Sequence, residues 1–172
     1  MAKITIVSCS SNTHAKSRLL AVSCQQELAL LGHNATLIDF HVLGDLPTWS
    51  NETLEKVKKI IRDCSYIVFS TPVYVYDVAH PVKALVEKLE KNDLENKVVG
   101  FLCAAGSKRS YMAPMNFSSA LMLNYRCWIV PRFVYACGDS FVDGVVTDEI
   151  NKRITLFSKD LMRFEKKYEV AC

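Results

Sequence analysis

Apolar runs alternate along the chain with segments whose apolar residues recur at helical spacing. The runs predict five strands, at residues 4–8, 35–40, 66–70, 97–103 and 127–135. The helical segments predict helices at residues 15–31, from Asn51 as a cap, from Pro81 onward, at 114–124 and at 148–168. The runs at 66–70 and 97–103 are almost continuously apolar, which is typical of central parallel strands covered on both faces.

This regular β-α alternation predicts an α/β protein in which helices cover both faces of a parallel sheet. Because crossovers are right-handed, five strands fit a flavodoxin-like three-layer sandwich with strand order 2-1-3-4-5. Pro131 falls in the fifth strand, and proline is tolerated at a sheet edge. No internal repeat or linker interrupts the pattern, so we expect a single domain over residues 1–172.

Composition and charge exclude several classes of protein. Half of the residues are hydrophobic and 23% are charged, as in an ordinary globular protein and unlike a disordered one. The net charge of +3 and the lack of a basic stripe give no support for a nucleic-acid partner. The apolar runs are too short for a signal peptide or for the ~18 residues of a membrane span. The seven cysteines are scattered without a C-x-x-C pair, so we expect no metal site and reduced thiols in the cytoplasm.

Ligands of such folds lie beyond the carboxyl ends of the strands, so the loops after the strands are the candidate sites. The first loop, residues 8–18, is dense in hydroxyl side chains and runs directly into a helix. The free N–H groups of a helix start suit a phosphate, although an ordinary capped loop is the alternative. The loop lacks glycine, which excludes a dinucleotide fingerprint and a P-loop. Ala15 stands where a low-molecular-mass phosphatase with Cys9 as nucleophile would need arginine.

The third loop, residues 71–81, is apolar for a loop and carries two tyrosines and three valines. Such groups would pack against a flat ring such as a flavin, or against a neighbouring subunit, and the two interpretations are compatible. In the next loop, Gly106 permits close approach of a ligand to the backbone. Lys108 and Arg109 would either meet the phosphate of a second nucleotide or remain solvated charges.

The segment Thr71-Pro72-Val73-Tyr74 and the following residues 81–89 resemble the T-P-x-Y stretch and subsequent helix of the NADPH-dependent FMN reductase family. Residues 103–106 and Val130-Pro131 are similar to that family's small-residue loop and late Val-Pro, and the resemblance spans nearly the whole chain. It implies FMN as the cofactor and NADPH or NADH as the hydride donor. The implied FMN phosphate positions are Ser10, Asn12, Ala15, Lys16 and Ser17, and the isoalloxazine positions are Pro72, Val73, Tyr74, Val75, Ala104, Ala105, Gly106 and Ser107.

The resemblance also implies an activity. NAD(P)H would pass a hydride to flavin N5, and a flavin, quinone or similar small-molecule acceptor would take the electrons, with no catalytic acid or base residue. A non-catalytic flavodoxin-like carrier and a domain that has lost the flavin are the alternatives. Flavodoxin-like carriers typically have the first-loop sequence T-x-T-G-x-T and an acidic composition. This chain has neither feature.

Two further expectations follow. The first loop departs from the family's G-S-x-R-x-x-S at Cys9, Asn12 and Ala15, so we expect weaker FMN binding than is usual for the family. The exposed apolar run at 73–78 predicts a homodimer or homotetramer, because such a patch is normally covered.

Overall fold

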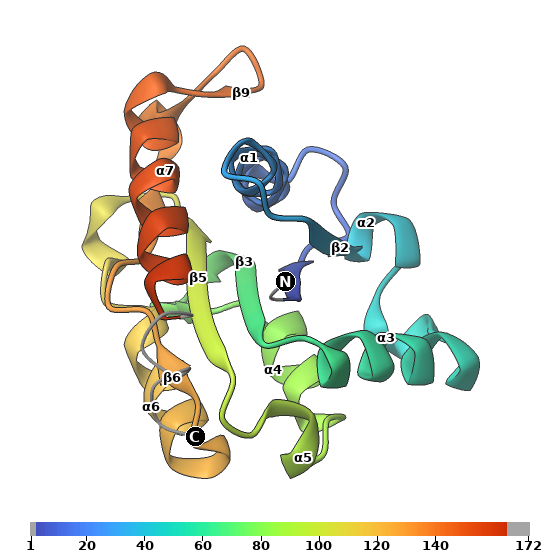
Figure 1. Ribbon diagram of the computed structural model, residues 1–172. Helices are drawn as coiled ribbons and strands as arrows, with labels where there is room; N and C mark the ends of the chain where they lie inside the picture. Colours follow the sequence, from blue (N-terminus) through green and yellow to red (C-terminus); the bar gives the residue numbers. More distant parts are fainter. Residues whose placement is uncertain (1–2, 165–172) are drawn as a thin grey trace.

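The computed structural model describes residues 3–164, which form a parallel sheet between two layers of helices (Figure 1). The order of the main strands is β2-β1-β3-β5-β6, and β7 also pairs with β5. All of these strand pairs are parallel. The bounds are β1 Ile4–Ser8, β2 Ala35–Asp39, β3 Tyr66–Tyr74, β5 Val98–Ala104, β6 Trp128–Ile129 and β7 Val134–Ala136. The predicted flavodoxin-like order is therefore confirmed, with β5 as the fourth predicted strand and β6 and β7 as the fifth.

The predicted fifth strand is split in two. Val98 pairs with Trp128 in β6, and Leu102 pairs with Val134 in β7. Pro131 lies in the break, where its missing N–H and fixed φ disfavour a continuous ladder. The place and direction of the strand were predicted correctly, but its continuity was not. A break is tolerated here because the strand pairs with only one neighbour.

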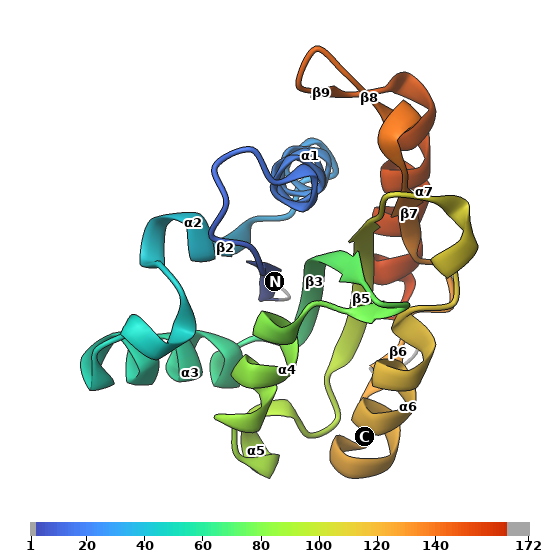
Figure 2. The same cartoon turned by 180° about the vertical axis from the view of Figure 1, so that it is seen from behind.

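The helices cover the two faces of the sheet (Figures 1 and 2). One apolar core contains residues of α1 (Lys16–Leu30) and α7 (Asp148–Arg163). The other contains residues of α3 (Asn51–Asp63), α4 (His80–Glu87) and α6 (Pro114–Tyr125). Among residues 3–164, no helix has the length and apolar character needed to cross a membrane.

Several short elements carry no periodic signal in the sequence. They are α2 (Phe40–Leu43), α5 (Lys91–Leu94), the 3-10 turns η1 (Leu46–Thr48), η2 (Lys108–Ser110) and η3 (Gly138–Ser140), and a hairpin of β8 (Phe141–Val142) and β9 (Val145–Val146). None was predicted, because one turn or two residues are too few to show a period.

The helix ends test the predicted boundaries. Gly32 closes α1 with φ 85°, as predicted. The cap of α3 was misplaced by one residue, because Ser50 Oγ accepts from the Thr53 N–H at 3.1 Å and Asn51 is the first helical residue. Pro81 lies in the first turn of α4, as predicted. The expected extension of the last helix to residue 168 lies outside the described residues.

The segment expected to be the third loop is instead a β-hairpin. β3 continues to Tyr74, and the chain turns back into β4 (Asp77–Val78). Val73 pairs with Val78 and Tyr74 with Asp77, antiparallel. The turn therefore consists of Val75 and Tyr76, both with positive φ, at 50° and 60°. The prediction of a loop at residues 71–78 was therefore wrong. Valine and tyrosine are not turn-forming residues, and their presence argued against a loop here.

Candidate functional site

The carboxyl ends of β1, β3 and β5 meet at one edge of the sheet. Ser8 is in register with Ser70, and Pro72 is in register with Ala104. The Cys9 N–H continues the pairing by donating to the Ser70 carbonyl at 2.9 Å. The three segments predicted to carry chemistry are therefore neighbours in space.

The start of α1 has the features of an anion site. Ser17 is only 1% exposed, and its Oγ has no hydrogen-bond partner among residues 3–164. Ala15 occupies the cap position, so the first N–H groups of α1 receive no side-chain cap from the described part of the chain. A buried hydroxyl without a partner costs about 1–3 kcal/mol, which a bound anion would offset. These features fit a phosphate at the helix start.

The rest of the first loop is folded on itself. Asn12 Oδ1 accepts from the His14 N–H at 2.9 Å, and the Asn12 carbonyl accepts from the Ala15 N–H at 3.1 Å. Ser10 Oγ lies 3.4 Å from the Asn12 nitrogen, as the acceptor of its N–H. Lys16 Nζ lies over the Phe141 ring, 5.3 Å from its centroid. The five predicted phosphate positions thus share one short segment, and Asn12, which stands where the family usually has arginine, keeps its amide NH2 group as a donor.

Residues from β2 and α2 support this loop and were not predicted from the sequence. Arg18 Nε lies 2.7 Å from Asp39 Oδ2, and Asp39 is 7% exposed. Asp39 Oδ1 also accepts from the His41 N–H at 3.1 Å, and His41 Nδ1 lies 3.2 Å from the Ser11 carbonyl oxygen. The sequence signal that could have indicated this support is the acidic residue Asp39 near the end of the second predicted strand.

The hairpin is held by a side-chain hydrogen bond at its base and is exposed at its tip. Thr71 Oγ1 accepts from the Ala79 N–H at 3.2 Å. At the tip, Tyr74, Val75 and Tyr76 are 66%, 95% and 64% exposed. Val73, in contrast, is buried in the core beneath the hairpin. Of the predicted ring-binding positions here, Tyr74 and Val75 offer side chains to a ligand and Val73 offers only backbone.

The segment after β5 is only partly available to a ligand. Ala104 and Ala105 are buried, and the Ala105 N–H donates to the Ala136 carbonyl at 2.9 Å. Gly106 is exposed, and a Cβ built there would meet nothing within 4 Å among the described residues. Tyr135 Oη donates to the Ser107 carbonyl at 2.8 Å, a support that the sequence did not indicate. Gly106 therefore offers the most open backbone of this segment.

The cysteines near the site are unreactive. Cys9 is fully buried, and burial raises the pKa of its thiol far above the usual range. Burial also raises the pKa of Cys103 to about 12. Since only the thiolate is a nucleophile, neither group can attack a substrate at neutral pH. This agrees with the sequence, in which Ala15 stands where a phosphatase with Cys9 as nucleophile would need arginine.

The strand order, the uncapped helix start and the aromatic hairpin at the carboxyl edge of the sheet define a flavodoxin-like α/β protein. The profile of the NADPH-dependent FMN reductase family matches residues 2–141. The chain belongs to this family.

Known proteins agree with this assignment. An NAD(P)H-dependent FAD/FMN reductase of Geobacillus thermodenitrificans (strain NG80-2) is 26% identical over 106 residues, which are 60% of this chain and 57% of that protein. The chain thus spans less than two thirds of that relative's length.

Two solved structures show the same fold. An oxidoreductase from Corynebacterium diphtheriae has a TM-score of 0.77 at 20% identity, over 97% of this chain and 98% of its own. A flavodoxin, WrbA-like protein from Agrobacterium tumefaciens has a TM-score of 0.73 at 12% identity, over 98% and 99%.

Proposed function

We propose that this protein binds FMN and oxidises NAD(P)H, passing the electrons to a small-molecule acceptor such as a flavin or quinone. The observation that carries the proposal is the buried, unpartnered Ser17 hydroxyl at the uncapped start of α1, next to β3, whose Ser70 Oγ donates to the Ser17 carbonyl at 2.6 Å. Membership of the NADPH-dependent FMN reductase family supports the same function, as does the reductase relative from Geobacillus.

The residues divide between the two parts of the cofactor. Ser10, Asn12, Lys16 and Ser17, with the first N–H groups of α1, would hold the phosphate. The hairpin at Tyr74 and the backbone at Gly106 would hold the ring system. Bound FMN would supply the hydride-accepting centre at N5. The protein's own part is to bind, orient and partly shield the reactants, which requires no acid or base side chain.

We also propose that the chain works as one FMN-binding domain in a homodimer or homotetramer in the cytoplasm. The hairpin tip is an apolar surface, since Tyr74, Val75 and Tyr76 are all more than half exposed. A closed pairing of identical subunits would cover such a surface. The six cysteines among the described residues are free, which fits a reducing compartment. Light scattering at micromolar concentration tests the assembly, and a monomeric mass contradicts it.

A titration with FMN followed by anaerobic addition of NADPH tests the function. The protein should bind FMN, and NADPH should bleach its visible absorption. Ser17→Ala should weaken FMN binding, while Ser119→Ala, an exposed serine on α6, should not. FMN binding without reduction by NADPH or NADH would favour the electron carrier. No binding at high micromolar FMN would favour a domain that has lost the flavin.

A further inference from the structure

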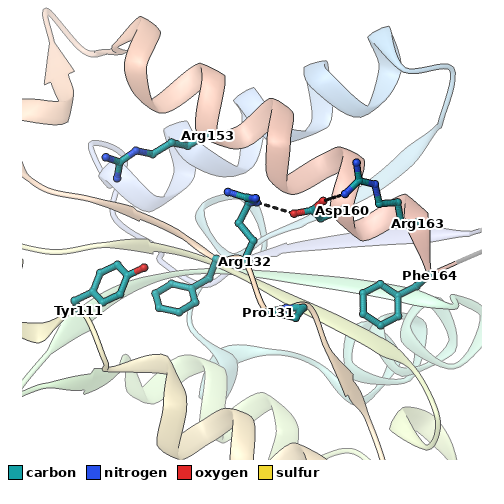
Figure 3. Close-up of a pocket in the computed structure, with 8 residues that line it drawn as sticks. Tyr111, Pro131, Arg132, Arg153, Asp160, Arg163 and Phe164 are labelled. Atoms are coloured by element: carbon teal, nitrogen blue, oxygen red, sulfur yellow. Dashed lines mark hydrogen bonds and ion pairs between the residues drawn. The ribbon is translucent and has the colours of Figure 1, made fainter.

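A cavity of about 790 Å3 is lined by residues of α7 and of the interrupted edge strand. None of the eight described residues that line it is among the predicted FMN positions. Arg153, Asp160 and Arg163 project into it from α7, and Arg132 projects from the break between β6 and β7 (Figure 3). The volume is in the range of small-molecule sites, so the cavity is a candidate site for a second ligand.

Arg132 is held in a position that suits an anion. Its Nε donates to Asp160 Oδ2 at 2.6 Å, and Arg163 Nη1 donates to Asp160 Oδ1 at 2.8 Å. Asp160 is therefore fixed by two arginines, and it orients Arg132 through Nε alone. The two Nη groups of Arg132 form a planar fork, and such a fork binds a phosphate with two parallel hydrogen bonds.

The lining carries an excess of positive charge, because three arginines accompany one aspartate. Arg153 Nη2 lies 2.7 Å from Glu149 Oε1, but both side chains are at least half exposed, and a surface pair of this kind is weak. Arg153 can therefore exchange Glu149 for a ligand of higher charge. A phosphate monoester carries a charge of about −1.5 to −2 at pH 7, which matches this excess better than the single charge of a carboxylate does.

Aromatic surface lies at the same end of the cavity as Arg153, where Figure 3 shows Tyr111. The rings of Tyr111 and Phe133 pack with their centroids 4.9 Å apart, and both residues line the cavity. Tyr111 is nevertheless 48% exposed, so part of its ring is available to a ligand. A flat ring packs favourably against aromatic side chains and against guanidinium groups. The lining therefore suits a ligand that has a flat ring next to its phosphate.

From this arrangement we infer that the cavity is a binding site for a small aromatic phosphate monoester, separate from the candidate flavin site. Arg132 and Arg153 bind the phosphate, and the ring packs against Tyr111 and Phe133. Asp160 is a positioning residue, because it acts on the ligand only through Arg132. The inference goes beyond the proposed function and does not depend on it, since the two sites share no predicted residue.

An NMR titration of the 15N-labelled protein with phenyl phosphate tests the site and locates it. The protein carries one equivalent of FMN, so that the candidate flavin site is occupied. Amide shifts should change to saturation at residues 131–133 and 153–164 and stay constant at residues 10–17. Methyl phosphate, which lacks the ring, and benzoate, which has a single charge, should each bind at least about threefold more weakly.

Two variants of Arg132 test the role of its fork. Arg132→Ala should weaken the binding of phenyl phosphate at least about tenfold, as expected for the loss of a charge-assisted contact. Arg132→Lys keeps the charge but lacks the fork, so it should weaken binding nearly as much. Lys152→Ala removes an exposed cation of α7 that does not line the cavity and should leave the affinity unchanged. The Arg132 side chain is 50% exposed, so we expect the variants to fold, and circular dichroism checks this.

Three results would overturn the inference: shifts confined to residues 10–17, equal affinity in wild type and Arg132→Ala, or an equal loss in Lys152→Ala. The proposed function is judged separately, because FMN binding is measured at residues 10–17 and at the hairpin. If the protein does not bind FMN, the proposed function fails. The same titration without FMN, compared between wild type and Arg132→Ala, then still decides whether the cavity binds phenyl phosphate.

Discussion

Tyr135 and Ser107 are joined by a hydrogen bond in which the phenolic O–H donates to the backbone carbonyl at 2.8 Å. Ser110 Oγ lies 2.6 Å from the same phenolic oxygen. Burial raises the pKa of Tyr135 above its ordinary value, so the phenol keeps its proton at neutral pH. One residue of β7 therefore fixes the segment that follows β5 at the candidate site.

Tyr135→Phe should loosen this segment. The loss of the hydrogen bonds should lower the free energy of unfolding by about 1 kcal/mol and weaken FMN binding. Urea denaturation and fluorescence titration measure the two effects. Tyr125→Phe is the matched control, because Tyr125 Oη bonds only weakly to the Val86 carbonyl at 3.5 Å, in another part of the molecule. Equal FMN affinity in wild type and Tyr135→Phe would show that the segment does not need this support.

The hairpin tip should tolerate asparagine better than its own valine. Val75 is 95% exposed and has φ 50°, a left-handed conformation that costs a β-branched residue about 1–2 kcal/mol. Val75→Asn should therefore raise the free energy of unfolding by about 1 kcal/mol. Val145→Asn should lower it, because Val145 is an exposed hairpin valine in β9 without a positive φ. Changes of the same sign in both variants would contradict this account of the turn.

Strain at an exposed tip indicates a functional reason to retain the valine. If Val75 contacts the flavin or a second subunit, the stabilised Val75→Asn protein should bind FMN less tightly or dissociate more readily. Titration and light scattering on the same preparation separate the two roles.

FMN binding should improve when the first loop is given the side chains usual in the family. Ala15→Ser and Asn12→Arg each add a donor for the phosphate. A hydrogen bond to a charged group contributes ~1.5–3 kcal/mol, so each variant should bind FMN about ten- to a hundredfold more tightly. Asn116→Arg places the same new charge on an exposed position of α6 and should have little effect. The first loop has been misinterpreted if neither Ala15→Ser nor Asn12→Arg gains affinity.

The buried thiols predict a loss of stability at high pH. Burial raises the pKa of Cys103 to about 12 and that of Cys127 to about 11, above the ordinary thiol value of 9.0. Above pH 9.0 the unfolded chain therefore releases protons that the folded protein keeps. The contribution of these thiols to the free energy of unfolding is complete below that pH. It is lost as the pH rises toward the pKa values of the folded protein.

Urea denaturation at about pH 8 and about pH 10 measures this effect, which amounts to about 1.4 kcal/mol per thiol for each pH unit above the unfolded pKa. Cys103→Ala should reduce the pH dependence by the share of one thiol. Val99→Ala, a buried change on the same strand, should lower stability at both pH values and keep the full pH dependence. An equal pH dependence in wild type and Cys103→Ala would contradict the assignment.

The sequence predicted the main strands because they are short apolar runs between helical segments, and right-handed crossovers then limited the strand order. The hairpin after β3 was missed because Pro72 interrupts the expected strand and Val75 and Tyr76 lack turn chemistry. The first loop was located correctly because hydroxyl residues directly before a helical segment are typical of a helix start, which a local pattern can show.

The supports of the site could not be predicted in the same way. Tyr135 is 28 residues from its partner Ser107, and Asp39 is 21 residues from Arg18. Such contacts depend on how the sheet brings its carboxyl ends together, and no local pattern marks them. The same holds for the ion pair between Arg132, in the break of the edge strand, and Asp160 on α7.

The central claim is that NAD(P)H reduces FMN on this protein. Its most direct test is the visible spectrum of the FMN-loaded protein during anaerobic titration with NADPH. We predict stoichiometric loss of the oxidised flavin absorption, with recovery when a quinone is added. A protein that binds FMN yet keeps the full oxidised spectrum in excess NADPH and in excess NADH would contradict the claim.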